Sequence, residues 1–244
     1  MEKFTYKKMF ENEKSFWWYV ARRKIIFSAM TKMNVSKGNI LELGSGTGGN
    51  VSFLSRFGSY TGIEKEQIAI NYAKTKFPDT KFIQGALPQI FNEITEKYNT
   101  IVLLDVIEHI EDDLKTLKST ASLLKENGFL IMTMPAFPFL WSNHDVVHHH
   151  HRRYTKKALF TLCQDSGYSI KYHSYFNFLL FPIILSIRFF KKIFNLKSSD
   201  DKPTSNIINK VLIKIFGFES LLIPHLRLPF GLSHIIILKK MTDK

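Results

Sequence analysis

The sequence predicts a doubly wound α/β fold, in which a mostly parallel sheet lies between two layers of helices. Short apolar segments alternate with helix-like segments across residues 40–134, as strands and crossover helices do in such a sheet. A glycine-rich turn at residues 44–48 follows the first apolar segment, and an acidic residue, Glu64, ends the second. These sheets bind ligands beyond the carboxyl ends of their strands, where we expect the turn and the acid to meet.

The expected elements follow in order along the chain. Clustered aromatic and basic side chains mark an amphipathic helix at residues 15–33, and short apolar runs suit buried strands. Strands are expected at residues 40–43, 60–64, 81–84 and 129–134, with a further strand that ends at Asp105. Helices are expected at residues 49–56, 67–76, 113–125 and 157–165.

The glycine-rich turn distinguishes two classes of cofactor. Glycines let the backbone approach a bound ligand closely. A dinucleotide site needs G-x-G-x-x-G to seat a pyrophosphate at a helix N-terminus, whereas this turn reads G-x-G-x-G and follows Glu42. A carboxylate there repels a pyrophosphate and attracts an ammonium or sulfonium group. For the loop taken alone, a purely structural glycine turn is the alternative.

Residues 42–48 (Glu-Leu-Gly-Ser-Gly-Thr-Gly) resemble motif I of class I S-adenosylmethionine-dependent methyltransferases, and residues 101–110 resemble that family's fourth strand and following turn. The resemblance implies S-adenosylmethionine as cofactor and a Rossmann-like, seven-stranded sheet finished by strands at residues 168–175 and 233–239, the last antiparallel. The acid often found near adenine is Ala86 here, so backbone groups of residues 85–87 are expected to hold the adenine. The implied cofactor-binding residues are Glu42, Gly44, Gly46, Gly48, Glu64, Lys65, Gly85, Ala86, Asp105, Val106 and His109.

Residues 140–154 resemble a bacterial subgroup of this family that is associated with glycan and lipid biosynthesis. Trp17 with residues 22–23, and residues 228–233 near the end, resemble the same subgroup. An arginine pair such as residues 152–153 can clamp an anionic substrate through bidentate hydrogen bonds, although we expect one of the two to form a structural ion pair. The expected acceptor-binding residues are Trp18, Arg22, Trp141, Arg152, Arg153 and Tyr154.

Two histidines are candidates for the catalytic base. Methyl transfer is a displacement at a sulfonium carbon, and positioning supplies much of its acceleration. A neutral oxygen or nitrogen nucleophile also benefits from a base whose pKa is near neutral, as that of histidine is. We expect His144 or His150 to serve, with Asp145 orienting an imidazole. The alternative is that both are solvated loop residues.

The histidine run at residues 148–151 suggests a metal site at first sight. Adjacent side chains of a strand or helix point in different directions, so at most two of them reach one ion. The sequence shows neither paired cysteines nor a carboxylate constellation beside the run. We therefore expect no metal ion.

We expect a single domain over residues 1–244, with a helical cap at residues 1–35 and a helical lid at residues 176–224. The lid holds two apolar stretches with basic flanks, joined by a polar segment at residues 195–205 that we expect to be a mobile loop. Its first apolar run is too short to cross a hydrocarbon core of about 30 Å. The lid therefore covers a pocket, attaches to a membrane surface as well, or forms an oligomer interface.

Composition and charge bear on the compartment and on the partners. A net charge of +13 is compatible with nucleic acid and with anionic membrane surfaces. The single cysteine, Cys163, excludes an internal disulfide, and residues 1–13 are too polar for a secretory signal. We expect a cytoplasmic protein with contact to the inner face of the membrane.

Three classes of function follow. The first is O- or N-methylation of a small-molecule or lipid-linked acceptor. The second is methylation of nucleic acid, RNA in particular; against it, no Asn-Pro-Pro-aromatic motif follows the fourth strand and no cysteine is placed to attack a pyrimidine. The third is a non-catalytic protein that binds S-adenosylmethionine or a membrane, and the intact glycine-rich turn and Glu64 argue against it. The acceptor and the oligomeric state stay open.

Overall fold

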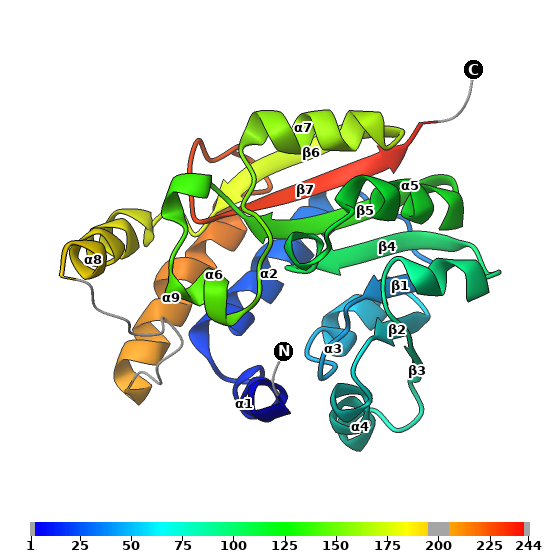
Figure 1. Cartoon of the computed structure of the whole chain (residues 1–244), viewed down its shortest axis with the longest axis horizontal. Coiled ribbons are helices and arrows are strands. Elements are labelled where there is room, and N and C mark those ends of the chain that lie inside the picture. The colour runs from blue at the N-terminus through cyan, green and yellow to red at the C-terminus, as the bar shows by residue number, and fades with distance from the viewer. Residues whose placement is uncertain (1–2, 195–204, 242–244) are drawn as a thin grey trace.

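Residues 3–194 and 205–241 are described in the computed structural model, and their strands form one seven-stranded sheet (Figure 1). The strand order is β3-β2-β1-β4-β5-β7-β6; β1 to β5 run parallel, and β7 is antiparallel to both its neighbours. The strands are β1 (Ile40–Leu43), β2 (Tyr60–Glu64), β3 (Lys81–Gln84), β4 (Tyr98–Leu104), β5 (Leu124–Pro135), β6 (Tyr168–Phe176) and β7 (Ser233–Lys240). The predicted fold class is confirmed.

The helices of the described residues agree largely with the expected ones. They are α1 (Lys3–Asn12), α2 (Trp17–Lys32), α3 (Val51–Leu54), α4 (Gln67–Lys76), α5 (Asp113–Leu123), α6 (Asn143–Val147), α7 (Lys156–Asp165), α8 (Phe181–Ile193) and α9 (Asn206–Leu222). α6 was not expected, and α1 was not expected as a separate helix within the predicted helical cap. α5 ends before residue 125 because Leu124 already pairs with Tyr98 of β4, so β5 begins earlier than its apolar core suggests. The expected loop at residues 195–205 lies almost wholly outside the described residues.

Both faces of the sheet are buried, and alternate strand residues serve opposite faces. In β4, Val102 and Leu104 pack with α2, α3 and α9, whereas Ile101 and Leu103 pack with α5 and α7. Figure 1 shows α5 and α7 on one side of the sheet and α2 and α9 on the other. This two-sided burial explains why the central strands read as continuous apolar runs in the sequence.

The last strand obeys the same rule although it is antiparallel. Residues 235–238 of β7 are all fully buried, and they alternate between the two faces. A strand that is apolar on both faces is most stable inside the sheet, which is where β7 lies, between β5 and β6.

The insertion between β6 and β7 consists of α8 and α9, which are placed differently. α9 packs along α2, with the ring of Phe216 fully buried and stacked on Trp18 at a centroid distance of 5.4 Å. α8 lies at the left edge of Figure 1, away from the sheet. Across residues 3–194 and 205–241, no helix has both the length and the apolar character that crossing a bilayer requires.

A buried carboxylate joins α9 to the turn after β6. Glu219 is fully buried and accepts hydrogen bonds from the backbone N–H groups of Asn177 at 2.7 Å and Leu179 at 2.9 Å. Burial raises the pKa of Glu219 to about 7. Without this carboxylate, backbone donors in the turn before α8 would lose their acceptor, so Glu219 helps to determine how the insertion leaves the sheet.

Candidate active site

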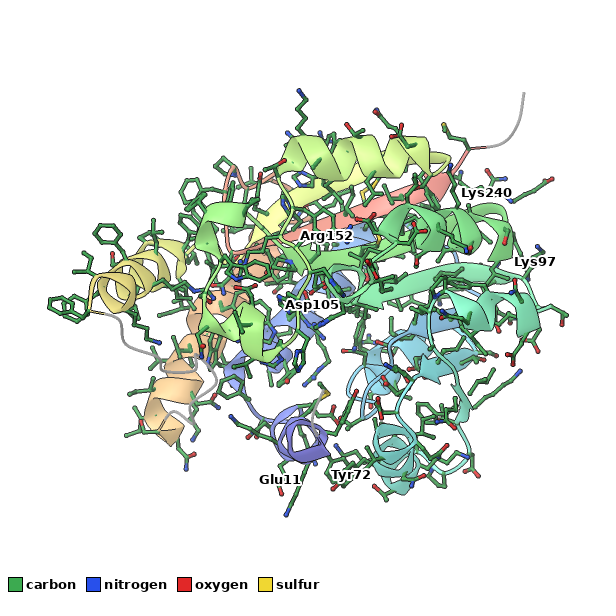
Figure 2. All side chains as sticks on the ribbon, in the orientation of Figure 1. Glu11, Tyr72, Lys97, Asp105, Arg152 and Lys240 are labelled. Atoms are coloured by element: carbon green, nitrogen blue, oxygen red, sulfur yellow. The ribbon has the colours of Figure 1, made fainter. Side chains whose placement is uncertain are left out.

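A large cavity lies at the carboxyl edge of the parallel strands. Its volume is about 1650 Å³, and its lining includes the turn after β1, the end of β2, and the residues that follow β3 and β4. Figure 2 labels Asp105 beyond the end of β4, among side chains from several loops. Sites for single small ligands measure about 300–1,000 Å³, so this cavity has room for a cofactor and a second molecule.

Helices from both ends of the chain complete the walls of this cavity. α1 contributes Tyr6 and Met9, α2 contributes Trp18, and α8 contributes Ile184 and Arg188. The guanidinium of Arg188 donates a hydrogen bond to the Leu140 carbonyl at 3.0 Å, which joins α8 to the loop after β5. Segments far apart in the sequence therefore surround one space.

The glycine-rich turn has the backbone shape that its glycines predict. Gly44 and Gly46 have φ angles of +75° and +53°, in the left-handed region that favours glycine. A side chain at Gly44 would lie 2.6 Å from a methyl group of Val106, so the turns after β1 and β4 are in close contact. Gly48, also predicted to bind the cofactor, packs against Ala73 of α4.

Glu64 is held in place by two backbone donors. Its carboxylate accepts hydrogen bonds from the N–H of Gly46 at 2.8 Å and from the N–H of Glu66 at 3.0 Å, one on each oxygen. Each carboxylate oxygen has a further lone pair with which it can accept a bond from a ligand hydroxyl. Lys65, Gly85 and Ala86 line the cavity with it.

Glu42 is fully buried behind the cavity wall. It accepts hydrogen bonds from the side-chain amide of Asn50 at 2.7 Å and from the hydroxyl of Tyr60. Burial raises the pKa of Glu42 to about 7, against the effect of these two hydrogen bonds. Glu42 therefore contacts the cavity through Asn50, which lines the cavity wall.

Asp105 and Arg22 were assigned to the cofactor and to the acceptor, and the structure brings them together. The guanidinium of Arg22 on α2 forms an ion pair with the Asp105 carboxylate just beyond β4. Asp105 has a φ angle of +58°. Both residues line the cavity, so α2 is attached to the sheet at the ligand-binding edge.

Asp145 is the centre of a buried hydrogen-bond network. It accepts bonds from Nδ1 of His150 at 2.9 Å, from Nε of Arg153 at 2.7 Å and from the backbone N–H of Ser142 at 2.8 Å. Burial acts to raise the pKa of Asp145, but the bonds from His150 and Arg153 prevail and hold it below its ordinary value. The carboxylate is therefore charged at neutral pH, and it orients the imidazole of His150.

The imidazoles of four histidines lie close to one another. The ring of His150 has its centroid 4.6 Å from that of His109 and 6.0 Å from that of His144, and His148 lies 4.3 Å from His144. All four line the cavity. Burial lowers the pKa of His109 to about 4, and burial also lowers that of His150 despite the opposing effect of Asp145. Both rings are therefore mostly neutral near pH 7.

Three predicted acceptor residues lie elsewhere. Arg152 donates to the Asp113 carboxylate at 2.7 Å, and the hydroxyl of Tyr154 donates to the same carboxylate at 2.9 Å. These bonds join the histidine loop to the start of α5. Trp141 is 42% exposed. Arg153, Arg22 and Trp18 do line the cavity.

The structure adds cavity residues that sequence reasoning missed. Glu108 and Asn177 are fully buried, and their side-chain oxygens accept no hydrogen bond from another residue. Tyr6 and Met9 belong to α1, which was not expected as a separate helix. The position of Glu108, three residues after Asp105, could have marked it as a cavity residue. Nothing in the sequence indicated, however, that its side chain is buried. No sequence signal marked Asn177.

The chain matches a family model described as a methyltransferase domain over residues 17–173. No curated protein sequence matches it significantly.

The structure is similar to those of several methyltransferases. An S-adenosylmethionine-dependent methyltransferase from Clostridium acetobutylicum aligns at a TM-score of 0.58 and 12% identity, covering 91% of this chain and 92% of that one. A methyltransferase from Archaeoglobus fulgidus aligns at a TM-score of 0.57 and 13% identity, and the alignment covers 89% of this chain and 94% of that one. The plantazolicin methyltransferase BamL was solved with SAH and a triazolic desmethylPZN analog. It aligns at a TM-score of 0.59 and 15% identity, and the alignment covers 98% of this chain and 89% of that one. At such identities, these likenesses concern the fold.

Replacing Glu64 by alanine should weaken the binding of S-adenosylhomocysteine. Hydrogen bonds to a charged group contribute about 1.5–3 kcal/mol, which corresponds to a rise of roughly 10- to 150-fold in the dissociation constant. Isothermal titration calorimetry measures the change. Asp79→Ala, which removes an exposed acid outside the cavity lining, should bind like the wild type. Unchanged affinity in a folded Glu64→Ala protein would show that this carboxylate does not contact the cofactor.

Proposed function

Since the chain belongs to the methyltransferase-domain family and is an S-adenosylmethionine-dependent methyltransferase, we propose that it methylates an oxygen or nitrogen of a small-molecule or lipid-linked acceptor. The observation that carries this proposal is the large cavity at the carboxyl edge of the sheet. It combines the glycine-rich turn and Glu64, which suit the cofactor, with a second set of residues that suits an acceptor.

We assign the cofactor to the part of the cavity nearest β1 and β2. Glu64 accepts hydrogen bonds from the ribose hydroxyls, and the turn from Gly44 lies beside the methionine portion. Backbone groups at Gly85 and Ala86 hold the adenine. The pairing of Asp105 with Arg22 supports a role for both in shaping this pocket, since each lines it.

We assign the acceptor to the part lined by the histidines, Arg153, Trp18 and the apolar side chains of α8. Ile184 and Ile187 give this wall an apolar character, while His144 and His150 add polar groups. Such a mixture suits a molecule with an apolar portion and a hydroxyl or amine. The resemblance to a subgroup associated with glycan and lipid biosynthesis supports the same class of acceptor.

The proposed reaction uses the histidines to activate the acceptor. A lone pair of the acceptor oxygen or nitrogen forms a bond to the methyl carbon while the carbon–sulfur bond breaks and its electron pair goes to sulfur. The proton of the acceptor leaves through the His144–His150 pair or through a group that these residues hold. Asp145 acts as a positioning residue, because it fixes Nδ1 of His150 and directs Nε2 away from itself.

Exposed apolar side chains on α8 and α9 support membrane contact. These exposed side chains include Phe189, Phe190 and Ile193 on α8 and Ile207, Phe218 and Leu221 on α9. Exposed Lys210 and Lys214 lie among those of α9. Apolar residues interleaved with lysines suit attachment to an anionic membrane surface, where a lipid-linked acceptor would be present. Such attachment places the protein at the cytoplasmic face of the membrane.

This surface argues against nucleic acid as the acceptor. Protein surfaces that bind nucleic acid are polar and strongly basic, whereas α8 and α9 expose phenylalanine, isoleucine and leucine. The net charge of +13 alone does not distinguish RNA from an anionic bilayer.

With radiolabelled S-adenosylmethionine and separate bacterial extracts of lipid, glycan and RNA, the protein should transfer label to the lipid or glycan fraction. Scintillation counting after phase separation measures the transfer. A protein with Gly46→Val, whose added side chain meets Met9 and enters the cofactor pocket, serves as the inactive control. Label confined to RNA would refute the proposed acceptor class.

Replacing His150 or His144 by alanine should lower turnover on the acceptor while leaving affinity for S-adenosylhomocysteine nearly unchanged. A group that takes up a proton in the transition state accelerates a reaction about 10²–10⁴-fold. His225→Ala is the control, because it removes an exposed histidine outside the cavity lining. Wild-type turnover in both His144→Ala and His150→Ala would show that positioning alone drives the reaction.

The protein should sediment with liposomes containing anionic lipid at low ionic strength and be released by added salt. Each basic residue near an anionic bilayer contributes about 1 kcal/mol. Charge reversal of Lys210 and Lys214 to glutamate should therefore weaken the association at least tenfold. The same change at Lys118 and Lys157, exposed on α5 and α7, should have little effect. Wild-type protein that stays in the supernatant contradicts membrane attachment.

A further inference from the structure

Glu108 is a buried carboxyl group that accepts no hydrogen bond from another described residue. It lies in the 3-10 turn η3 (Ile107–His109) directly after β4, it is fully buried, and neither carboxylate oxygen accepts a hydrogen bond from another residue. The arginines beside it are engaged with other acids: Arg22 pairs with Asp105, and Arg153 pairs with Asp145. A bound cation would give the unsatisfied oxygens of this buried group a partner.

Two imidazoles converge on the same point. A carboxylate oxygen of Glu108 and one ring nitrogen of each of His109 and His150 lie within 4.8 Å of one another. The two rings are nearly perpendicular, at 82°. Glu108 and His109 come from the turn after β4, and His150 comes from the histidine loop. The backbone N–H of His151 donates to the Glu108 carbonyl at 2.8 Å, which holds the two segments together.

Each of the two imidazole rings has one nitrogen whose lone pair can bind an ion. Nδ1 of His150 is bonded to Asp145, so Nε2 carries the available lone pair. A neutral imidazole has one acceptor nitrogen, so the ring of His109 can also offer a lone pair. Histidines that bind metal ions usually donate their other ring N–H to a carboxylate or a carbonyl, which orients the ring. Asp145 is itself held by Arg153, so this support is rigid.

We propose that Glu108, His109 and His150 bind a divalent transition-metal ion in the wall of the cavity. All three residues line the cavity, so an ion there would face the space assigned to the acceptor.

The donor set favours zinc and its neighbours over magnesium or calcium. Two imidazoles suit zinc, cobalt, nickel and iron, whereas magnesium and calcium prefer sites made of oxygen alone. Two histidines, one glutamate and an open fourth position form a known catalytic zinc arrangement. Zinc–nitrogen and zinc–oxygen bonds of about 2.1 Å hold tetrahedral ligands roughly 3.4 Å apart. The three side chains therefore draw closer together when the ion binds.

The open position gives the ion a role in the reaction, an inference that rests on the proposed function. An acceptor hydroxyl bound to the ion has a lowered pKa and releases its proton to solvent. The resulting oxygen forms the bond to the methyl carbon, while the carbon–sulfur bond breaks and its electron pair goes to sulfur. His150 then activates the acceptor through the ion that it holds, and not by taking up the proton itself.

The test is a metal titration of the full chain in the absence of cofactor and acceptor. After dialysis against a chelator, the wild-type protein should bind one Zn²⁺, measured by calorimetry and by a rise in melting temperature. Co²⁺ in place of Zn²⁺ should give visible absorption bands with the intensity of a four- or five-coordinate site. Glu108→Gln and His150→Ala should each weaken Zn²⁺ binding at least tenfold.

His151→Ala is the matched control and should bind Zn²⁺ as the wild type does, since its exposed ring lies outside the cluster. Circular dichroism verifies that each variant is folded. The Co²⁺ spectrum is recorded on the wild type, so it tests the site even where a variant does not fold. The inference is overturned if the wild type binds neither ion, or if both Glu108→Gln and His150→Ala bind as tightly as His151→Ala does. Because neither cofactor nor acceptor is present, failure here leaves methyl transfer untouched. Failure to label any acceptor would, in turn, leave the metal site untouched.

Discussion

The burial of both faces of the central sheet is the constraint on which the rest of the structure depends. Strand residues such as Ile101 and Val102 face opposite helical layers, and both are fully buried. Polar groups therefore reach a ligand only where strands end. Gly44, Glu64 and Asp105 stand at three such ends and line one cavity. The site is at the carboxyl edge because the hydrophobic effect leaves few other places for polar groups.

Two largely buried ion pairs connect segments of the chain. Arg22 of α2 meets Asp105 after β4, and Arg153 meets Asp145 in the histidine loop. Breaking a buried pair by removing one partner is strongly destabilising, so each pair holds a cavity wall in position. Glu108 differs from Asp105 and Asp145, because neither of its carboxylate oxygens accepts a hydrogen bond from another described residue.

The insertion between β6 and β7 combines two roles that its amphipathic sequence does not separate. α9 is part of the core, since Phe216 packs against Trp18 and Glu219 binds the turn before α8. α8 lies at the cavity wall, with Arg188 bonded to the Leu140 carbonyl and Phe189 exposed. One helix thus stabilises the sheet, while the other connects the acceptor space with the outer surface of the protein.

The sequence by itself determined the fold and the position of the glycine-rich turn and Glu64 at the edge of the sheet. Strand and helix periodicity are local properties, so α4 and β3 appear at the residues that their patterns predict. The glycines of the turn and Glu64 could be predicted for the same reason, because a turn conformation and a strand end are encoded within a few residues.

The tertiary structure alone decided the contacts on the histidine side of the cavity. The contact of His150 with His109, the pairing of Arg22 with Asp105 and the binding of Arg152 to Asp113 each join segments far apart in the chain. The histidine run did not reveal this cluster, because only one of its members, His150, meets Glu108 and His109. Such contacts depend on how layers pack and on which charges are left without a partner, and neither is a property of a local pattern.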